Sequence, residues 1–249
     1  MKFFLLLLTL LVFAPNAFGD NIFIIPGSKP GFASGLATYA TGTAFKTRAV
    51  KDRSTYCRYR SGGDVDIGFS LTLLCSFAPC PMPRRVGAAD GRVDSISGVD
   101  DAIAFIAEDN VFGADENDYT VTLEYVTPSP SDLIIECFDT TLYGNFNTVT
   151  VANPFNFLEL SNDSGIEIHT RIVVTKNDGT ELSKTNVTIG ARQQRDIAIH
   201  DLAGAANTFG RITVAHDGAL NGLRASITKY TSSFLITAST PFTTRGNEQ

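Results

Sequence analysis

Residues 65–77 read VDIGFSLTLLCSF, and this stretch decides the fold class. Apolar side chains recur at every second position from Val65 to Phe77. Small and polar residues separate most of them: Asp66, Gly68, Ser70, Thr72 and Ser76. Successive side chains of a β-strand point to opposite faces of the sheet. The alternation therefore predicts a strand with one buried row and one solvent-facing row.

The same period of two recurs along the chain in short runs bounded by Gly, Asn, Asp and Pro. The clearest connection between two runs is Asn177-Asp178-Gly179, because Asp-Gly tolerates the positive φ of a tight hairpin turn. Many short strands separated by turn residues predict an all-β fold of sandwich-like units. The further predicted strands are 55–60, 119–125, 133–138, 148–151, 155–160, 166–175, 186–189, 195–199, 209–215, 223–230 and 234–238.

Two segments carry helical signals. Ser97 and Asp100 have the spacing of a helix capping box, whereas Ile103 and Phe105 alternate with alanines as in a strand. Residues 97–107 are therefore consistent with a short helix and with an edge strand. Residues 201–207 predict one helical turn.

Residues 1–19 have the three parts of a secretory signal peptide. Lys2 supplies a positive charge, an apolar run follows over residues 3–13, and small residues occupy positions 17 and 19. Cleavage is predicted before Asp20. The apolar run is shorter than the roughly 20 residues that span a bilayer, and no later run approaches that length. We therefore expect a secreted, periplasmic or cell-surface protein with no membrane span in the mature chain.

The mature chain is long enough for two domains of ordinary size. We expect a disulfide-containing β domain over residues 20–145, a β-sandwich domain over residues 146–242 and a disordered tail over residues 243–249. The second domain is close in size to an immunoglobulin-like module of roughly 100 residues. The expected resemblance to immunoglobulin or fibronectin domains is one of architecture, because the chain has no Trp for the Cys…Trp…Cys signature.

The chain has four cysteines: Cys57, Cys75, Cys80 and Cys137. An even number in an exported chain favours two disulfides. Three connectivities are open, and we favour Cys57–Cys137 between distant strands and Cys75–Cys80 around a Pro-containing loop. The absence of a C-x-x-C pair and the oxidising compartment disfavour zinc.

The chain is acidic, with a formal net charge of −6 and a pI near 5.0. Its net field therefore does not favour nucleic acid as a partner. Basic residues gather in 46–60 and acidic residues in 90–118. These segments are interpreted as solvated faces that compensate each other, with a head-to-tail self-contact or an anionic ligand as the alternative.

The candidate metal ligands are His200, Asp201, His216 and Asp217, which form two His-Asp dipeptides at predicted strand ends. Imidazole and carboxylate are competent metal ligands, and strand-end loops of a sandwich can converge. The competing interpretation is that both dipeptides belong to turns. No catalytic residue is assigned, since no Gly-x-Ser-x-Gly motif occurs.

Oxygen-rich loops suggest one further cation. Asp115, Asn117 and Asp118 are candidate ligands for a structural calcium ion, which takes six to eight oxygens. A solvated acidic loop is the alternative. Asn162 and Asn186 begin N-glycosylation sequons. The lack of Trp disfavours a carbohydrate cleft lined by large aromatic rings.

The sequence thus predicts an exported, non-enzymatic β-sandwich protein that binds or builds at a surface, in the periplasm or outside the cell. Its partner would be an unidentified protein or surface, recognised by loops at the sandwich ends. The alternative is a secreted hydrolase that uses the two His-Asp dipeptides, with or without a metal ion.

Overall fold

The computed structural model describes the backbone of eleven parts of the chain: 21–25, 40–61, 70–75, 84–86, 102–107, 118–127, 133–149, 155–203, 208–231, 233 and 236–244. Several predictions fall outside these residues. They are the signal peptide, Cys80, Asp115 and Asn117, and residues 97–101 of the 97–107 segment.

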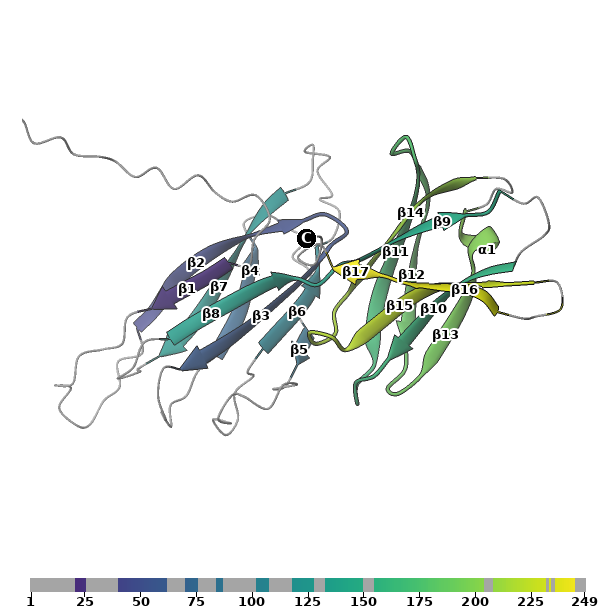
Figure 1. The fold of residues 1–249 in the computed structure, drawn as a ribbon. Coiled ribbons are helices and arrows are strands. Elements are labelled where there is room, and N and C mark those ends of the chain that lie inside the picture. Colours follow the sequence, from purple (N-terminus) through teal and green to yellow (C-terminus); the bar gives the residue numbers. More distant parts are fainter. Residues whose placement is uncertain are drawn as a thin grey trace, which may run out of the picture.

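In the described residues, eight strands precede residue 140, and we call them the N-terminal half (Figure 1). They form a five-stranded sheet in the order β1-β8-β3-β6-β5 and a three-stranded sheet in the order β2-β7-β4. Their bounds are β1 Asn21–Ile25, β2 Ala40–Val50, β3 Ser54–Ser61, β4 Ser70–Cys75, β5 Arg84–Val86, β6 Ala102–Ile106, β7 Asp118–Thr127 and β8 Leu133–Asp139.

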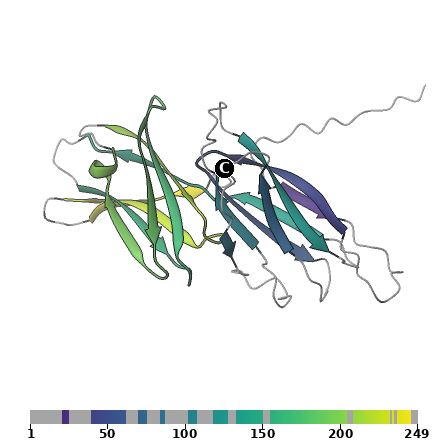
Figure 2. The same ribbon diagram turned by 180° about the vertical axis from the view of Figure 1, so that it is seen from behind.

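The remaining elements form the C-terminal half, which lies beside the N-terminal half in both views (Figures 1 and 2). One sheet has the order β13-β10-β15-β16 and the other β12-β11-β14-β9-β17. The bounds are β9 Leu142–Asn147, β10 Phe155–Asn162, β11 Ile168–Lys176, β12 Glu181–Ile189, β13 Gln194–Ala198, α1 Ile199–Ala203, β14 Phe209–His216, β15 Leu223–Tyr230, β16 Ile236–Pro241 and β17 Thr243–Thr244.

The predicted all-β class is confirmed, and every strand pair in the described residues is antiparallel. The hairpin at residues 177–179 is also confirmed, with Gly179 at φ 87°. The segment 102–106 is a strand, so the helix alternative is wrong there. That strand, β6, pairs with β3 on one side and with β5 on the other, so it does not lie at the sheet edge.

The predicted strand 148–151 is wrong at residues 148 and 149, which follow the end of a strand. The strand is β9, which pairs with β14 over residues 142–147. The expected boundary between residues 145 and 146 would fall inside β9, and the division into two domains stays a prediction. Residues 243 and 244, placed in the expected tail, form β17 against β9.

The core of the C-terminal half is supplied by both of its sheets. Alternate residues of β10 and β15, such as Leu158 and Ile227, belong to the same buried cluster as Ile172 of β11 and Val214 of β14. Alternation explains this arrangement, because each strand turns its apolar row inward and leaves its second row on the outer face. The outer rows of β10 and β15 therefore lie outside this cluster.

The predicted Cys57–Cys137 disulfide is confirmed. The two cysteines lie directly opposite each other on the neighbouring strands β3 and β8, and both are buried. The bond links positions 80 residues apart in the sequence. Cys75 lies in β4, and its predicted bond to Cys80 stays a prediction.

A buried junction joins the two halves. The connection between β8 and β9 consists of Thr140 and Thr141, which are 2% and 0% exposed. The amide of Ser54 on β3 donates a hydrogen bond to Thr141 Oγ1 (2.9 Å). Tyr56 of β3 also belongs to one apolar cluster with Ala219 of the β14–β15 connection. Polar and apolar contacts thus hold the halves together.

No helix in the part of the chain that the structure describes has the length and apolar character needed to cross a membrane.

We expect the double substitution Cys57→Ala/Cys137→Ala to lower the free energy of unfolding of the N-terminal half by about 2–4 kcal/mol, because the unfolded chain regains the entropy of an 80-residue loop. Hydrogen exchange measured by mass spectrometry would detect the loss in β3 and β8. Unchanged protection of β3 and β8 would contradict the prediction.

Candidate functional site

His216 is the most deeply placed of the predicted metal ligands. It ends β14 and is 2% exposed. The amide of Gly218 donates to its Nδ1 (3.2 Å), and its Nε2 lies 3.1 Å from the carbonyl oxygen of Thr140. Since an amide can only donate, Nδ1 is the acceptor and the single ring proton lies on Nε2, which donates to Thr140. Both ring nitrogens therefore have protein partners.

The imidazole of His216 is held neutral. Burial lowers its pKa from 6.5 to about 4, while the neighbouring Asp217 and the Thr140 carbonyl act in the opposite direction. The backbone amide of His216 donates to Ser54 Oγ (2.6 Å), which ties β14 to β3. This residue is thus part of the junction between the halves.

Asp52 forms the charged part of the same junction. Its carboxylate contacts Arg171 of β11 at 3.1 Å and Lys184 of β12 at 2.7 Å. The three side chains are 13–24% exposed, so the ion pairs are partly shielded from solvent. Asp52 has φ 57°, a left-handed conformation that Asp tolerates better than most residues. The turn between β2 and β3 thereby aims this carboxylate at the C-terminal half.

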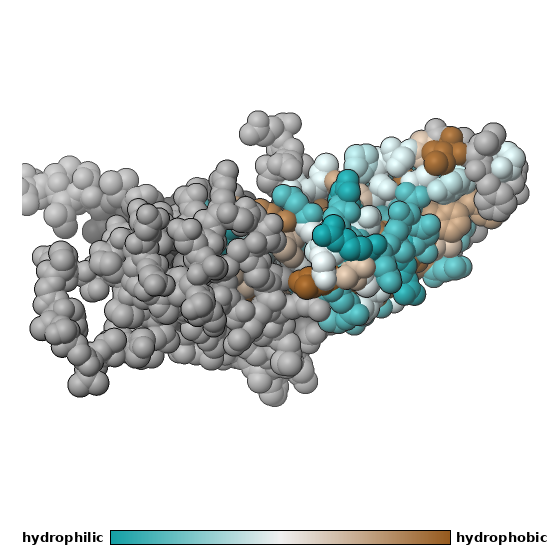
Figure 3. All heavy atoms as spheres, turned by 90° about the horizontal axis from the view of Figure 1, so that it is seen from below, coloured by the Kyte–Doolittle hydropathy of each residue, from teal (hydrophilic) through white to brown (hydrophobic). Residues whose placement is uncertain are grey.

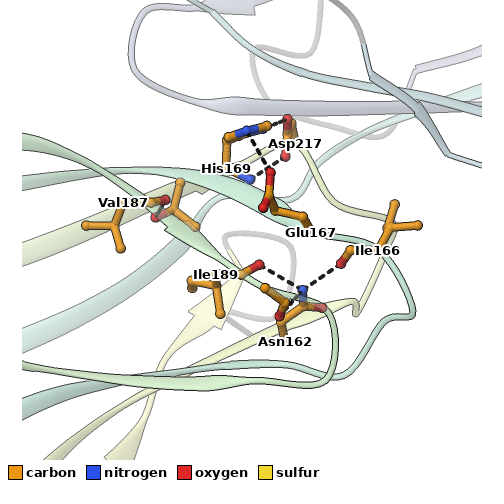
Figure 4. Close-up of polar contacts among 9 residues, drawn as sticks. Asn162, Ile166, Glu167, His169, Val187, Ile189 and Asp217 are labelled. Atoms are coloured by element: carbon orange, nitrogen blue, oxygen red, sulfur yellow. Dashed lines mark hydrogen bonds and ion pairs between the residues drawn. The ribbon is translucent and has the colours of Figure 1, made fainter.

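Asp217 pairs with His169, a residue that was not among the predicted ligands (Figure 4). His169 donates its backbone amide to Asp217 Oδ1 (2.8 Å) and its ring Nδ1 lies 2.9 Å from Oδ2. On the other side of the ring, Nε2 lies 3.4 Å from Glu167 Oε1. The His169 side chain is half-exposed. This arrangement orients one imidazole between two carboxylates.

The four predicted metal ligands do not form one group. His200 and Asp201 lie in α1, which contacts β10, β12 and β13, while His216 and Asp217 lie at the junction end of β14. Within the described residues, no three His, Cys, Asp or Glu side chains are grouped closely enough to hold a metal ion. Of the predicted calcium ligands, only Asp118 is described, at the start of β7.

The two sequon asparagines have contrasting surroundings. Asn162 is 1% exposed, and its Nδ2 lies 2.7–3.1 Å from the carbonyl oxygens of Ile166, Ile189 and Gly190 (Figure 4). This amide links the end of β10 to the end of β12 in the other sheet. Asn186 is exposed on β12 and accepts a hydrogen bond from Arg171 Nε (3.1 Å). Of these two, only Asn186 is accessible to a modifying enzyme.

A further group of polar side chains lies on the outer face of the β13-β10-β15-β16 sheet, and sequence reasoning missed it. Glu159 of β10 accepts hydrogen bonds from three hydroxyls of β15, those of Ser226, Thr228 and Tyr230, at 3.3, 2.7 and 2.8 Å. Ser239 Oγ of β16 lies 3.2 Å from Thr228 Oγ1. The network crosses three neighbouring strands.

Apolar side chains lie on the same face, because partners in an antiparallel register share a face. Phe155 and Ile236 both pair with Tyr230, and they are 43% and 65% exposed. Phe157 packs edge-to-face on Tyr230 with ring centroids 5.6 Å apart. We call this surface the Glu159 platform, and it consists of Phe155, Phe157, Glu159, Ser226, Thr228, Tyr230, Ile236 and Ser239.

The phenol of Tyr230 stays protonated on this platform. Its hydrogen bond to Glu159, its burial and the negative charges of Glu159 and Asp196 raise its pKa above 10.0. Tyr230 is therefore a fixed donor to Glu159. The signal for this site is present in the sequence as the outward rows of two alternating segments, but only the strand register brings them together.

Exposed hydrophobic side chains are scattered over the described surface seen in Figure 3, where they form separate patches beside hydrophilic ones. Among the residues whose burial is described, the exposed large hydrophobic side chains outside the platform are Val149, Ile166 and Phe209. Single exposed apolar residues are normal on soluble proteins. Exposure alone therefore does not identify a site. The platform differs from the other exposed apolar residues because a hydrogen-bonded network lies beside its apolar side chains.

No protein family model and no curated protein matches this chain. Among solved structures, it is similar to a calcium-binding mutant of Bacteroides uniformis beta-glucuronidase 2, with 9% identity and a TM-score of 0.16. The match covers 90% of this chain and 32% of that protein, so the chain spans less than half of its length. A likeness at this TM-score supports no statement about fold or activity.

We expect the stability of the protein to fall as the pH is lowered from about 6.5 to about 4. The unfolded chain takes up a proton on His216 near pH 6.5, whereas the folded protein takes it up only near pH 4. The difference corresponds to about 3 kcal/mol. Urea unfolding at pH 7, 6, 5 and 4 should show this loss in the wild type and a loss smaller by that amount in His216→Gln.

The matched control for this experiment is His200→Gln, which removes an imidazole outside the junction. It should keep the wild-type loss of stability between pH 7 and 4. The same pH dependence in His216→Gln and the wild type would show that His216 does not cause it.

We expect Asn162→Asp to destabilise the protein by at least about 2 kcal/mol, because a carboxylate cannot donate to the three carbonyl oxygens that surround Nδ2. Asn186→Asp is the matched control, since it places a carboxylate beside Arg171 on an exposed strand. Its effect should stay within about 0.5 kcal/mol. Equal unfolding midpoints of the two variants would refute the role of Asn162.

Proposed function

We propose that this chain is an exported, non-enzymatic binding protein that acts at the cell surface, in the periplasm or outside the cell. Its two halves would be sandwich-like domains of immunoglobulin or fibronectin architecture, the first carrying the disulfide. Secretion rests on the signal-peptide pattern of residues 1–19 and agrees with an oxidised Cys57–Cys137 pair.

The sandwich proposal for the C-terminal half is supported by its core. Side chains from both of its sheets form one buried cluster, as two sheets packed face to face require. The number of strands and the antiparallel pairing also agree with such a domain. For the N-terminal half, the support is the pair of antiparallel sheets, one with five strands and one with three.

The Glu159 platform is the observation that carries the binding function. It combines exposed apolar side chains with a polar network on regular strands, and strands hold side chains in fixed positions. A binding surface needs this combination of apolar area and oriented polar groups. The partner would then be recognised by the outer face of the β13-β10-β15-β16 sheet, in addition to or in place of the loops at the sandwich ends.

A secreted hydrolase is the second candidate, and the Asp217–His169 pair favours it. Asp217 orients the imidazole of His169 through Nδ1, as a carboxylate does beside a catalytic general base. In this version His169 replaces His216 as the reactive imidazole, because both nitrogens of His216 bond to the junction.

Expression of the full chain in a bacterium with a secretion pathway tests the proposed function. We expect the exported protein to begin at Asp20, as measured by N-terminal sequencing, and to turn over none of a panel of chromogenic esters, phosphates and glycosides. Retention of the protein in the cytoplasm would contradict export. Turnover that His169→Gln abolishes would replace the binding function by the hydrolase.

A further inference from the structure

The Glu159 platform has a defined hydrogen-bond polarity. An ionised carboxylate can only accept, so the hydroxyls of Ser226, Thr228 and Tyr230 all direct their protons to Glu159. Each hydroxyl has one proton, and the remaining lone pairs of Ser226 and Tyr230 are acceptors. The platform therefore offers fixed acceptor oxygens, and a ligand must bring the donors.

The charge of the platform excludes one class of ligand. Asp196 of β13 lies opposite Glu159 in the strand register, so two carboxylates share this part of the face. The effect of Asp196 and Glu159 on the pKa of Tyr230 is consistent with this placement. Phosphates, sulfates and polyanions would meet like charges here. The fitting ligand is neutral or positively charged.

Apolar side chains border the polar network. Phe155 and Phe157 alternate with inward-facing residues along β10, and Ile236 begins β16 on the other side of Tyr230. A ligand that bridges them must present apolar C–H surface next to hydroxyl donors. Sugar rings have this combination, because their C–H faces stack on aromatic rings while their hydroxyls point outward.

We propose that the Glu159 platform binds a neutral carbohydrate chain across β10, β15 and β16. This inference rests on the proposed function of the protein as a binding module and names the class of ligand. Phe155, Phe157 and Tyr230 provide the aromatic surface that Trp provides in many sugar sites, so the absence of Trp does not exclude it. Thr228 is buried and serves to orient Glu159.

Affinity electrophoresis of residues 20–249 tests this proposal. The gels contain one neutral polysaccharide each, namely hydroxyethylcellulose, xylan, galactomannan or dextran, or one polyanion, polygalacturonate or heparin. We expect retardation by at least one neutral polysaccharide and by neither polyanion. Calorimetric titration with oligosaccharides of the retarding polymer then gives the dissociation constant.

Two platform variants should each weaken this binding by about tenfold. Glu159→Gln replaces one of the two acceptor oxygens by an NH2 group, which cannot accept a proton from a hydroxyl. Phe155→Ser removes an exposed ring that contributes little to the core. Phe155→Ser keeps the test decisive if Glu159→Gln fails to fold. The matched control is Thr188→Ala on the exposed outer strand β12, which should bind like the wild type.

Three results would overturn the proposal. They are no retardation by any neutral polysaccharide, retardation by the polyanions alone, and binding that both platform variants retain at full strength. If the protein is exported and turns over no substrate but fails in these assays, only the carbohydrate inference is wrong. If it stays in the cytoplasm or acts as a hydrolase, the proposed function itself is wrong.

Discussion

A neutral imidazole in a buried place is the constraint on which the arrangement of the two halves depends. His216 accepts a hydrogen bond from the Gly218 amide and donates one to the Thr140 carbonyl. It thereby satisfies two backbone groups that solvent cannot reach. Its own amide bonds to Ser54 on the other half. A second ring proton, on Nδ1, would face the Gly218 amide, which is also a donor. Burial and this donor together favour the neutral form of the His216 imidazole.

The junction around this imidazole uses three kinds of contact. They are the ion pairs of Asp52, the apolar cluster that contains Tyr56 and Ala219, and the buried threonines of the linker. A two-residue linker with buried side chains leaves little freedom for rotation. The outer face of the β10–β15 sheet is thereby held at one orientation relative to the N-terminal half.

Sequence patterns predicted most strands of the C-terminal half, because their inward rows are regularly apolar. They missed β9, in which only Leu142 and Phe146 are large, buried and apolar. This strand is stabilised by its pairing with β14 and has no regular apolar pattern of its own. The Glu159 platform was missed for a related reason. Glu159 and Tyr230 lie 71 residues apart, and only the strand register shows that they meet. The Cys57–Cys137 bond was predicted because an even number of cysteines behind a signal-peptide pattern favours disulfides.

The position of that bond also sets how the protein responds to a pulling force. A load applied between the two ends of the chain passes from Cys57 directly to Cys137 and bypasses the 80-residue segment that the bond closes. That segment would otherwise contribute roughly 270 Å of contour length when extended. The disulfide thus limits how far the N-terminal half can be drawn out. The parts that can yield under tension are the segment before Cys57, the buried junction and the C-terminal sheets.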